Sequence, residues 1–206
     1  MVKGLKIRFE IHNILFSIYK FNKTLNNSSI KKKINKQKKE DISFLHNVTL
    51  NSMRFHLHCL KIINKFIKKK LRDQEKVLLI SAITQIVFLN FKEYAVINCT
   101  VEIAKKLKLY PGLINASLKK IAENKNDLRE IKIRFNDFQP WFQKETNSLS
   151  DYEKKQFLNY FYKEPDIHIV FKDEEKLKKF EDNLIKTSKI SGFLLDKENI
   201  QNKKSF

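Results

Sequence analysis

Glycine and proline are scarce in this chain, each occurring three times in 206 residues. All-β sandwiches and barrels need many turn residues, so this scarcity excludes them as the main architecture. Hydrophobic residues make up 42% of the chain and aromatic residues 12%, which is enough for a core and excludes general disorder. We therefore expect long helices joined by short polar loops, in one domain with an appendage.

Cysteine and long apolar runs are also rare. The two cysteines, Cys59 and Cys99, are too few for a disulfide framework, and no secretory signal is recognisable. The most apolar run, Val77 to Leu89, is interrupted by polar residues and is well short of the ~20 residues that cross a bilayer. The sequence therefore predicts a soluble, cytoplasmic protein with no membrane partner.

Acidic residues are outnumbered, with 23 Asp and Glu against 42 Lys and Arg, which gives a net charge of +19. Such a surplus favours a polyanionic partner, with nucleic acid first and an acidic membrane surface second. Codon bias in an AT-rich genome would also inflate lysine, as solvated surface residues without a partner. Charge alone leaves both interpretations open.

Apolar residues recur at helical spacing through most of the first 125 residues. The run from Val77 to Leu89 is apolar on nearly every face, which is typical of a helix at the centre of a bundle. Asp41 and Ser43 are candidate caps of a long helical stretch that we expect to contain a break. The expected segments are 5–22, a short helix with a connector in 23–41, and then 41–70, 72–91, 92–109 and 112–124.

The composition changes after about residue 129. An aromatic patch around Pro140 precedes a capped helix at 150–163. Alternation then predicts a strand at 165–171, a helix at 172–186 and a second strand at 190–195. We therefore expect a helical domain at 1–128, an aromatic linker and helix at 129–164, and an incomplete β-α-β extension at 165–206 that is too short for an independent domain.

Three runs carry a family resemblance by their order: "LLISAITQIVFL" (78–89), "YAVINCTVEIAKKL" (94–107) and "GLINASLKKI" (112–121). With "DISFLHNVTLNSMR" (41–54) before them, they resemble the NusB/RsmB RNA-binding domain over about residues 5–125. Cys99 stands where an acidic residue is common in that family, and Ala116 replaces a frequent glycine. The resemblance implies an all-α, NusB-like helical bundle that binds RNA, with a short C-terminal α/β extension.

The tail sharpens the resemblance. The aromatic patch with Trp141, the following helix and "EPDIHIVF" (164–171) look like the linker of RsmB-type (Sun/Fmu) rRNA cytosine-5 methyltransferases. "IVF" stands here where those proteins have Arg-Val-Asn. The resemblance implies the non-catalytic, N-terminal part of such an enzyme, which contacts small-subunit rRNA and serves a separate catalytic domain. The alternative is a NusB-type transcription antitermination factor that works through RNA and a ribosomal protein.

Catalytic motifs are not recognisable in the chain. The glycines at 4, 112 and 192 are isolated and cannot build a loop for S-adenosylmethionine, and neither cysteine follows a proline as the methyltransferase family requires. His56 and His58 lie two residues apart on a helix, so they cannot share a metal, and we expect one half-buried and one surface histidine. We expect no enzyme activity from this chain by itself, and no cofactor or metal.

Two basic surfaces are candidates for RNA contact. The N-terminal one includes Lys3, Lys6, Arg8, Lys31, Lys32 and Lys33, and the resemblance favours it. The second is a helical stripe of Lys61, Lys65, Lys68, Lys69 and Arg72, for which a plain solvated face is the alternative. Because lysine binds phosphate as a point charge, we expect salt-dependent binding with little sequence selectivity. For Trp141 we favour sealing of the bundle end over base stacking.

Overall fold

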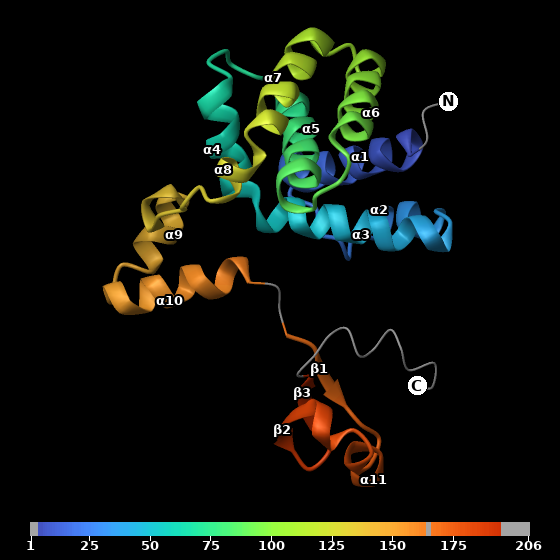
Figure 1. Ribbon diagram of the computed structural model, residues 1–206, viewed down its shortest axis with the longest axis vertical. Coiled ribbons are helices and arrows are strands. Elements are labelled where there is room, and N and C mark those ends of the chain that lie inside the picture. Colours follow the sequence, from blue (N-terminus) through green and yellow to red (C-terminus); the bar gives the residue numbers. More distant parts are fainter. Residues whose placement is uncertain (1–3, 164–165, 195–206) are drawn as a thin grey trace. The chain divides into compact units, whose positions relative to one another are not determined.

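The computed structural model describes residues 4–163 and 166–194. The chain forms two compact units, Met1–Tyr162 and Lys163–Phe206. The first unit is all-helical in its described part, as the sequence predicted (Figure 1). Its elements are α1 Leu5–Phe21, α2 Ser28–Asn35, α3 Lys39–Arg54, α4 His56–Phe66, α5 Asp73–Ile83, the π-helix Thr84–Phe88, α6 Glu93–Lys106, α7 Pro111–Glu123, α8 Lys125–Arg129, the 3-10 helix Phe135–Asp137, α9 Pro140–Glu145 and α10 Asp151–Tyr162.

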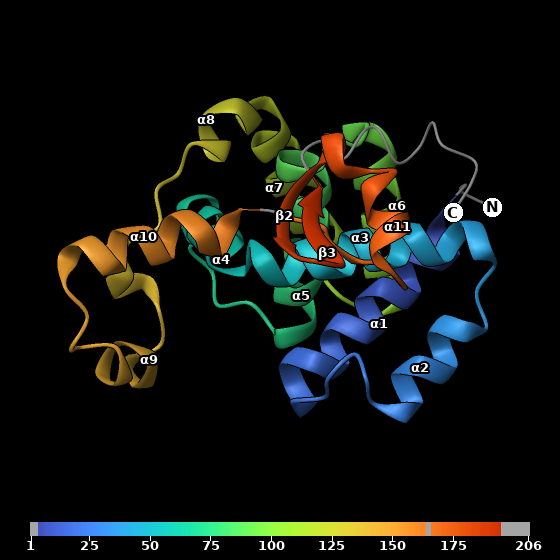
Figure 2. The same ribbon diagram turned by 90° about the horizontal axis from the view of Figure 1, so that it is seen from below.

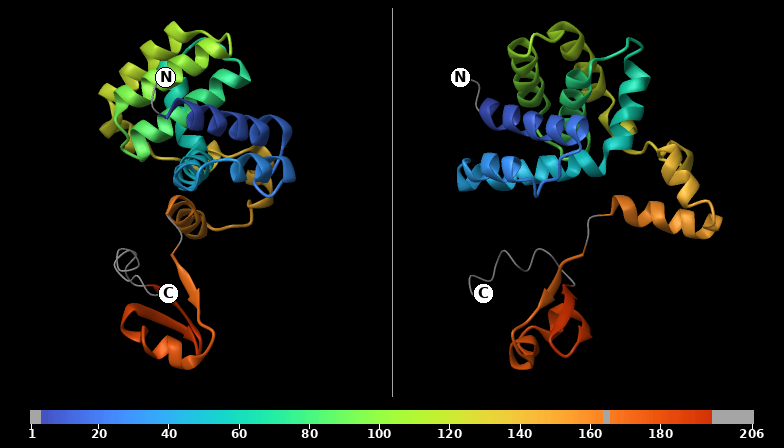
Figure 3. Two further views of the ribbon diagram at one scale, coloured as in Figure 1. Left: turned by 90° about the vertical axis from the view of Figure 1, so that its right-hand side faces the viewer. Right: turned by 180° about the vertical axis from the view of Figure 1, so that it is seen from behind.

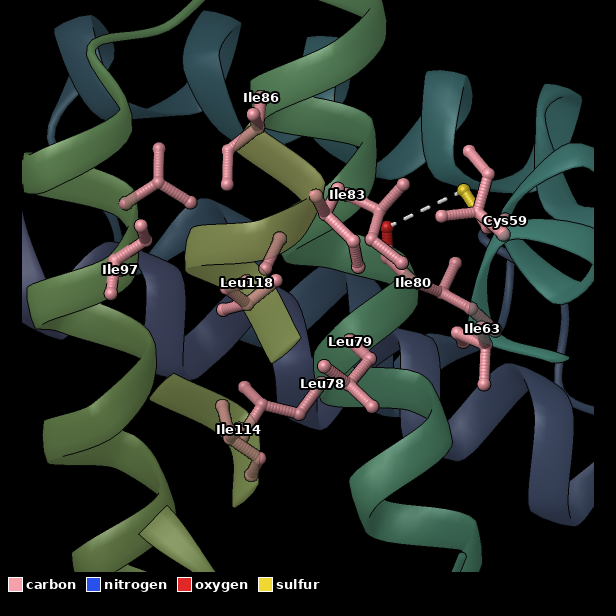
Figure 4. Packing of buried hydrophobic residues seen from close by; sticks show 14 of the residues in the cluster. Cys59, Ile63, Leu78, Leu79, Ile80, Ile83, Ile86, Ile97, Ile114 and Leu118 are labelled. Atoms are coloured by element: carbon pink, nitrogen blue, oxygen red, sulfur yellow. Dashed lines mark hydrogen bonds between the residues drawn. The ribbon is translucent and has the colours of Figure 1, made fainter. Parts of the chain in front are cut away.

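Helix α5 occupies the centre of the bundle, which confirms the prediction from its apolar faces. It packs against α1, α4, α6 and α7, and its side chains from Val77 to Ile83 are all buried. Figure 4 shows how they interdigitate with Ile97 of α6 and Leu118 of α7. Polar residues at the end of this run are satisfied locally: Thr84 Oγ1 donates to the Ile80 carbonyl at 2.9 Å.

The predicted long helical stretch at 41–70 divides at Phe55 into α3 and α4. Helix α3 begins at Lys39, two residues before the expected Asp41 cap, so Asp41 lies in its first turn. Helix α4 ends at Phe66, earlier than expected. It ends there because Ile67 turns to an extended conformation and its side chain packs into the core. Residues 67–72 therefore form the loop that joins α4 to α5.

Helix α2 lies in the angle between α1 and α3 (Figure 3). Its apolar side is short, because only Ile30 and Ile34 are buried. They join Ile7 and Ile11 of α1 in a small core of their own. The remaining positions of α2 are therefore free to carry lysines toward solvent.

The second unit holds a three-stranded antiparallel sheet in the order β1-β3-β2, with β1 His168–Val170, β2 Leu184–Ser188 and β3 Ser191–Leu194. The short helix α11, Glu174–Lys178, and a 3-10 turn at Glu181–Asn183 connect β1 to β2. The predicted helix at 172–186 was therefore too long, and β2 was missed. Leu184 explains the error, because it reads as a helical position but is buried in the sheet beside Phe171 and Leu177. No helix in the described residues is long and apolar enough to cross a membrane.

Candidate nucleic-acid interface

The N-terminal basic surface is only partly available for a ligand. Lys3 lies outside the described residues, and Lys6 is exposed on α1. Arg8 instead turns inward: its Nε donates to Gln85 Oε1 at 2.7 Å, and its guanidinium lies 5.0 Å from the centre of the Phe44 ring. Burial lowers the pKa of Arg8. Arg8 therefore ties α1 to the central helix and does not extend into solvent.

The three lysines of α2 differ in exposure. Lys31 and Lys32 are exposed, while Lys33 Nζ lies 3.5 Å from Glu10 Oε1 of α1. Glu10 is one turn after Lys6, so these side chains share one side of α1. We call Lys6, Lys31, Lys32 and Lys33 the α1–α2 lysine group. The Lys33–Glu10 pair thus joins the lysines of α2 to the side of α1 that carries Lys6.

The predicted helical stripe is divided by the early end of α4. Lys61 is half-buried and already bonded, because its Nζ pairs with Asp137 Oδ2 at 2.5 Å and donates to the Lys132 carbonyl at 3.1 Å. Lys65 is exposed on the last turn of α4, whereas Lys68 and Arg72 lie in the loop that follows. The prediction that all of these lie along one helix was therefore wrong.

The loop at 67–72 meets the turn between α6 and α7. Lys69 Nζ lies 4.3 Å from the centre of the Tyr110 ring, and the Arg72 guanidinium carbon lies 5.1 Å from it. Arg72 Nη2 also donates to the Lys108 carbonyl at 3.3 Å. The Tyr110 side chain is 54% exposed, so its ring is accessible beside two cations. Attraction between a cation and an aromatic face stabilises this arrangement.

The buried Glu75 stabilises the contact between the loop at 67–72 and the turn that contains Tyr110. Its side chain is only 2% exposed, and its carboxylate accepts from the backbone N–H of Arg72 at 2.8 Å and from Arg72 Nη2 at 3.0 Å. The backbone N–H of Tyr110 donates to the same carboxylate at 3.4 Å. Burial opposes the ionisation of Glu75, but the bonds from Arg72 outweigh it and hold the pKa below its usual range. We call Glu75, Lys69, Arg72, Lys108 and Tyr110 the Tyr110 cluster.

Sequence analysis missed most of this cluster. Glu75 stands at the third position of α5, a spacing at which a glutamate often bonds back to the cap, and this signal was available. No such signal links Lys69 to Tyr110, because the two residues lie 41 positions apart and meet only through the turn at the start of α7. Pro111, at the first position of α7, fixes the chain direction just after Tyr110.

The buried reactive groups have no common site. Burial raises the pKa of Cys59 to about 12, and its thiol lies against the Ile80 carbonyl. His58 is buried beside the rings of Phe88 and Tyr162, and His56 is half-buried, so the expected surface histidine is wrong. Aromatic residues enclose His58 because α10 folds back onto α4. The described residues hold no group of three or more side chains suited to a metal ion.

Comparison with known proteins supports the helical part of this description. The model of the NusB family matches residues 6–123, which is more than half of the chain and includes both the α1–α2 lysine group and the Tyr110 cluster. A search of curated proteins gives no match. The match ends before α8, so α9, α10 and the second unit lie beyond it. The chain belongs to the NusB family of helical RNA-binding domains.

Proposed function

We propose that this protein binds RNA mainly through the phosphate backbone, using the Tyr110 cluster and the α1–α2 lysine group. The observation that carries the proposal is the exposed Tyr110 ring with Lys69 and Arg72 beside it. The buried Glu75 holds this arrangement in place from below. Clustered cations attract phosphates, and an aromatic ring among them adds a face on which a base can stack.

The charge balance supports the same conclusion. Glu75 is the one acidic residue of the cluster, and it is buried and bonded to Arg72, so it exposes little negative charge. In the α1–α2 lysine group, Glu10 neutralises at most one of four lysines. The cations are mostly lysines, which act as point charges and do not read base edges by paired hydrogen bonds. Binding should therefore be strongly salt-dependent and weakly selective for sequence.

We further propose that the RNA is small-subunit rRNA and that the chain acts, in the cytoplasm, as the RNA-binding part of an RsmB-like rRNA methyltransferase. In this proposal residues 1–128 bind RNA, 129–164 form the linker, and 165–206 belong to an α/β region that leads toward a catalytic domain. The resemblance of "QPWF" and "EPDIHIVF" to the RsmB linker, together with the small sheet after it, supports this proposal. The sheet is also what favours it over the second candidate, a NusB-type antitermination factor that works with a ribosomal protein.

The test is binding to small-subunit rRNA fragments, measured by gel shift at about 50 and about 200 mM salt. If about four phosphates are neutralised on single-stranded RNA, affinity should fall roughly 50-fold over this range. Affinity that stays flat, or no binding at all, would contradict the proposal. Tighter binding to a transcript leader RNA that requires a ribosomal protein would favour the antitermination role instead.

A matched pair of variants locates the surface. Lys69→Gln with Lys108→Gln removes two charges from the Tyr110 cluster and leaves Glu75 and Arg72 in place. The control, Lys119→Gln with Lys120→Gln, removes two exposed charges from the outer side of α7. We expect the first double variant to lower the slope of log affinity against log salt concentration by about 1.4, which corresponds to two phosphate contacts. The control should change this slope little. Equal losses would show that only overall charge matters.

A further inference from the structure

A groove with an aromatic wall lies on a part of the first unit that the RNA-binding surfaces do not include. Two adjoining hollows, of about 430 and 340 Å³, share Tyr19 and His56 as a common boundary. The first opens between α1, α4 and α5, and the second between the α3–α4 corner and the segment α9–α10. We call the two together the Trp141 groove, after the residue that stands at the rim of the second hollow.

The wall of the groove is fastened to the bundle at two points. At one, Lys61 of α4 pairs with Asp137 at 2.5 Å. At the other, the Tyr162 ring at the end of α10 packs edge-on against His58 of α4, with ring centres 4.4 Å apart. Figure 2 shows α9 and α10 beside α4 at one side of the bundle. The family match ends at residue 123, so this wall lies beyond the matched residues.

Aromatic rings make the wall rigid and leave its rim open. Phe138 and Phe142 stack with centres 5.0 Å apart, and Phe157 and Phe161 lie 5.3 Å apart behind them. Trp141 projects from this cluster and remains 66% exposed. It does not seal the end of the bundle, so the expectation from sequence was wrong. An indole held at its base by packed rings and open to solvent on its face is pre-organised for stacking.

The boundary between the two hollows is also fixed. The Tyr19 ring lies against His56 with centres 4.6 Å apart, and the Tyr19 hydroxyl donates to the Ser52 carbonyl at 3.1 Å. Beyond it, exposed Phe21 packs edge-on against Phe16, which lines the first hollow. Aromatic faces therefore line the groove from one hollow to the other.

Positive charges outnumber negative ones among the residues that line the groove. Lys20 and Lys76 line the first hollow, and Arg54 lines the second. The acidic residue of the lining, Asp73, is bound to Lys20 at 2.6 Å, and this pairing lowers the pKa of Asp73. Two cations, Lys76 and Arg54, therefore remain without a carboxylate among the residues that line the groove. An anionic partner with flat rings meets both the cations and the aromatic faces.

We propose that the Trp141 groove takes an unpaired stretch of RNA, with bases stacked on Trp141 and phosphates near Arg54 and Lys76. This inference rests on the proposed RNA binding and adds a preference for single strands. A duplex keeps its base faces stacked inside, so its bases cannot reach the groove, whereas an unpaired strand can turn them outward. An amphipathic protein helix would bury the same apolar rim but leave the π-faces without a specific partner.

Trp141 itself reports on the groove, because it is the one tryptophan of the chain. Its fluorescence should be quenched when an unpaired oligoribonucleotide is added to the full chain, and should change little with a duplex of the same length. Quenching by both RNAs alike, or by neither while RNA binds, would overturn the inference. A blue shift with an amphipathic peptide and no quenching by RNA would assign the groove to a protein partner instead.

Variants separate this inference from the proposed function. Trp141→Ala should weaken binding of the unpaired strand about tenfold, within the range of one lost base stack, and Trp141→Phe should restore most of it. The salt slope should stay the same, since no charge is lost. Tyr160→Ala is the control, because Tyr160 is 69% exposed on α10 and does not line the groove. If Trp141→Ala binds like the unchanged protein, the groove inference fails and RNA binding stands. If the unchanged protein binds no RNA, both fail.

Discussion

Replacing Glu75 by alanine should measurably destabilise the helical unit. The carboxylate is buried and accepts from two backbone N–H groups, those of Arg72 and Tyr110, as well as from the Arg72 guanidinium. Removing it leaves both N–H groups without their acceptor. It also removes the carboxylate that accepts from the Arg72 N–H at the start of α5. It also frees the loop at 67–72 from the turn that precedes α7.

The expected cost follows from these contacts. The hydrogen bond from the Arg72 N–H caps α5 with a charged acceptor, and such a bond contributes about 1.5 kcal/mol. The Tyr110 bond is longer, at 3.4 Å, and adds about 0.5 to 1 kcal/mol. The pair with Arg72 adds little, because the arginine side chain is 52% exposed. The free energy of unfolding should therefore fall by about 2 to 3 kcal/mol, or roughly 4 to 12 °C in melting temperature.

Urea denaturation followed by the helical circular dichroism signal measures this change. Glu75→Gln should cost about 1 kcal/mol, since the amide oxygen still accepts one N–H. The matched control is Glu93→Ala, which breaks a half-buried pair between the Glu93 and Lys125 side chains at the surface and should cost less than about 1 kcal/mol. If Glu75→Ala costs no more than Glu93→Ala, the bracing role that we assign to Glu75 is refuted.

Two further predictions concern buried titratable groups. Burial lowers the pKa of His12 and of His58 to about 4, from an ordinary 6.5, so only the unfolded chain takes up these protons as the pH falls below 6.5. The free energy of unfolding should therefore be highest above about pH 6.5 and fall toward pH 4, by up to about 3 kcal/mol for each histidine. His12→Phe should remove the part of this fall that His12 causes, as measured by urea titrations at several pH values. Burial raises the pKa of Cys59 to about 12 and also raises that of Cys99, so both thiols should resist alkylation at about pH 8 in the native protein and react in urea. Rapid labelling of the native protein would contradict the buried positions.

Helix content and the identity of the central helix could be predicted because they depend on local pattern. The spacing of apolar residues set which faces turn inward, and the run from Val77 to Leu89 was apolar all round, so only a central position could bury it. A break within the stretch at 41–70 was also expected, from its length alone, and the structure places it at Phe55. The end of α4 was not expected, because Lys68 continues the helical spacing. In the structure Ile67 takes an extended conformation, and its side chain is buried in the core.

The candidate site was predicted less well than the fold. Two isoleucines anchor α2 on α1 and leave Lys31 and Lys32 exposed, while Lys33 pairs with Glu10 of α1. Arg8 has the same charge but bonds to Gln85, a residue 77 positions later, which no local pattern reveals. Trp141 was expected to be covered, but in the structure it packs edge-on against Phe142 and is 66% exposed.

By itself, then, the sequence determined a basic, helix-rich chain with a buried central helix and the order of motifs that marks the NusB family. These properties follow from composition and from periodicity within single helices. The tertiary structure alone decided which cations are free, that Glu75 holds Arg72 and Tyr110 together, and that α9 and α10 wall a groove. The contacts from Glu75 to Tyr110 and from Lys61 to Asp137 join residues tens of positions apart, and they depend on where each helix ends and which side chains compete for the core.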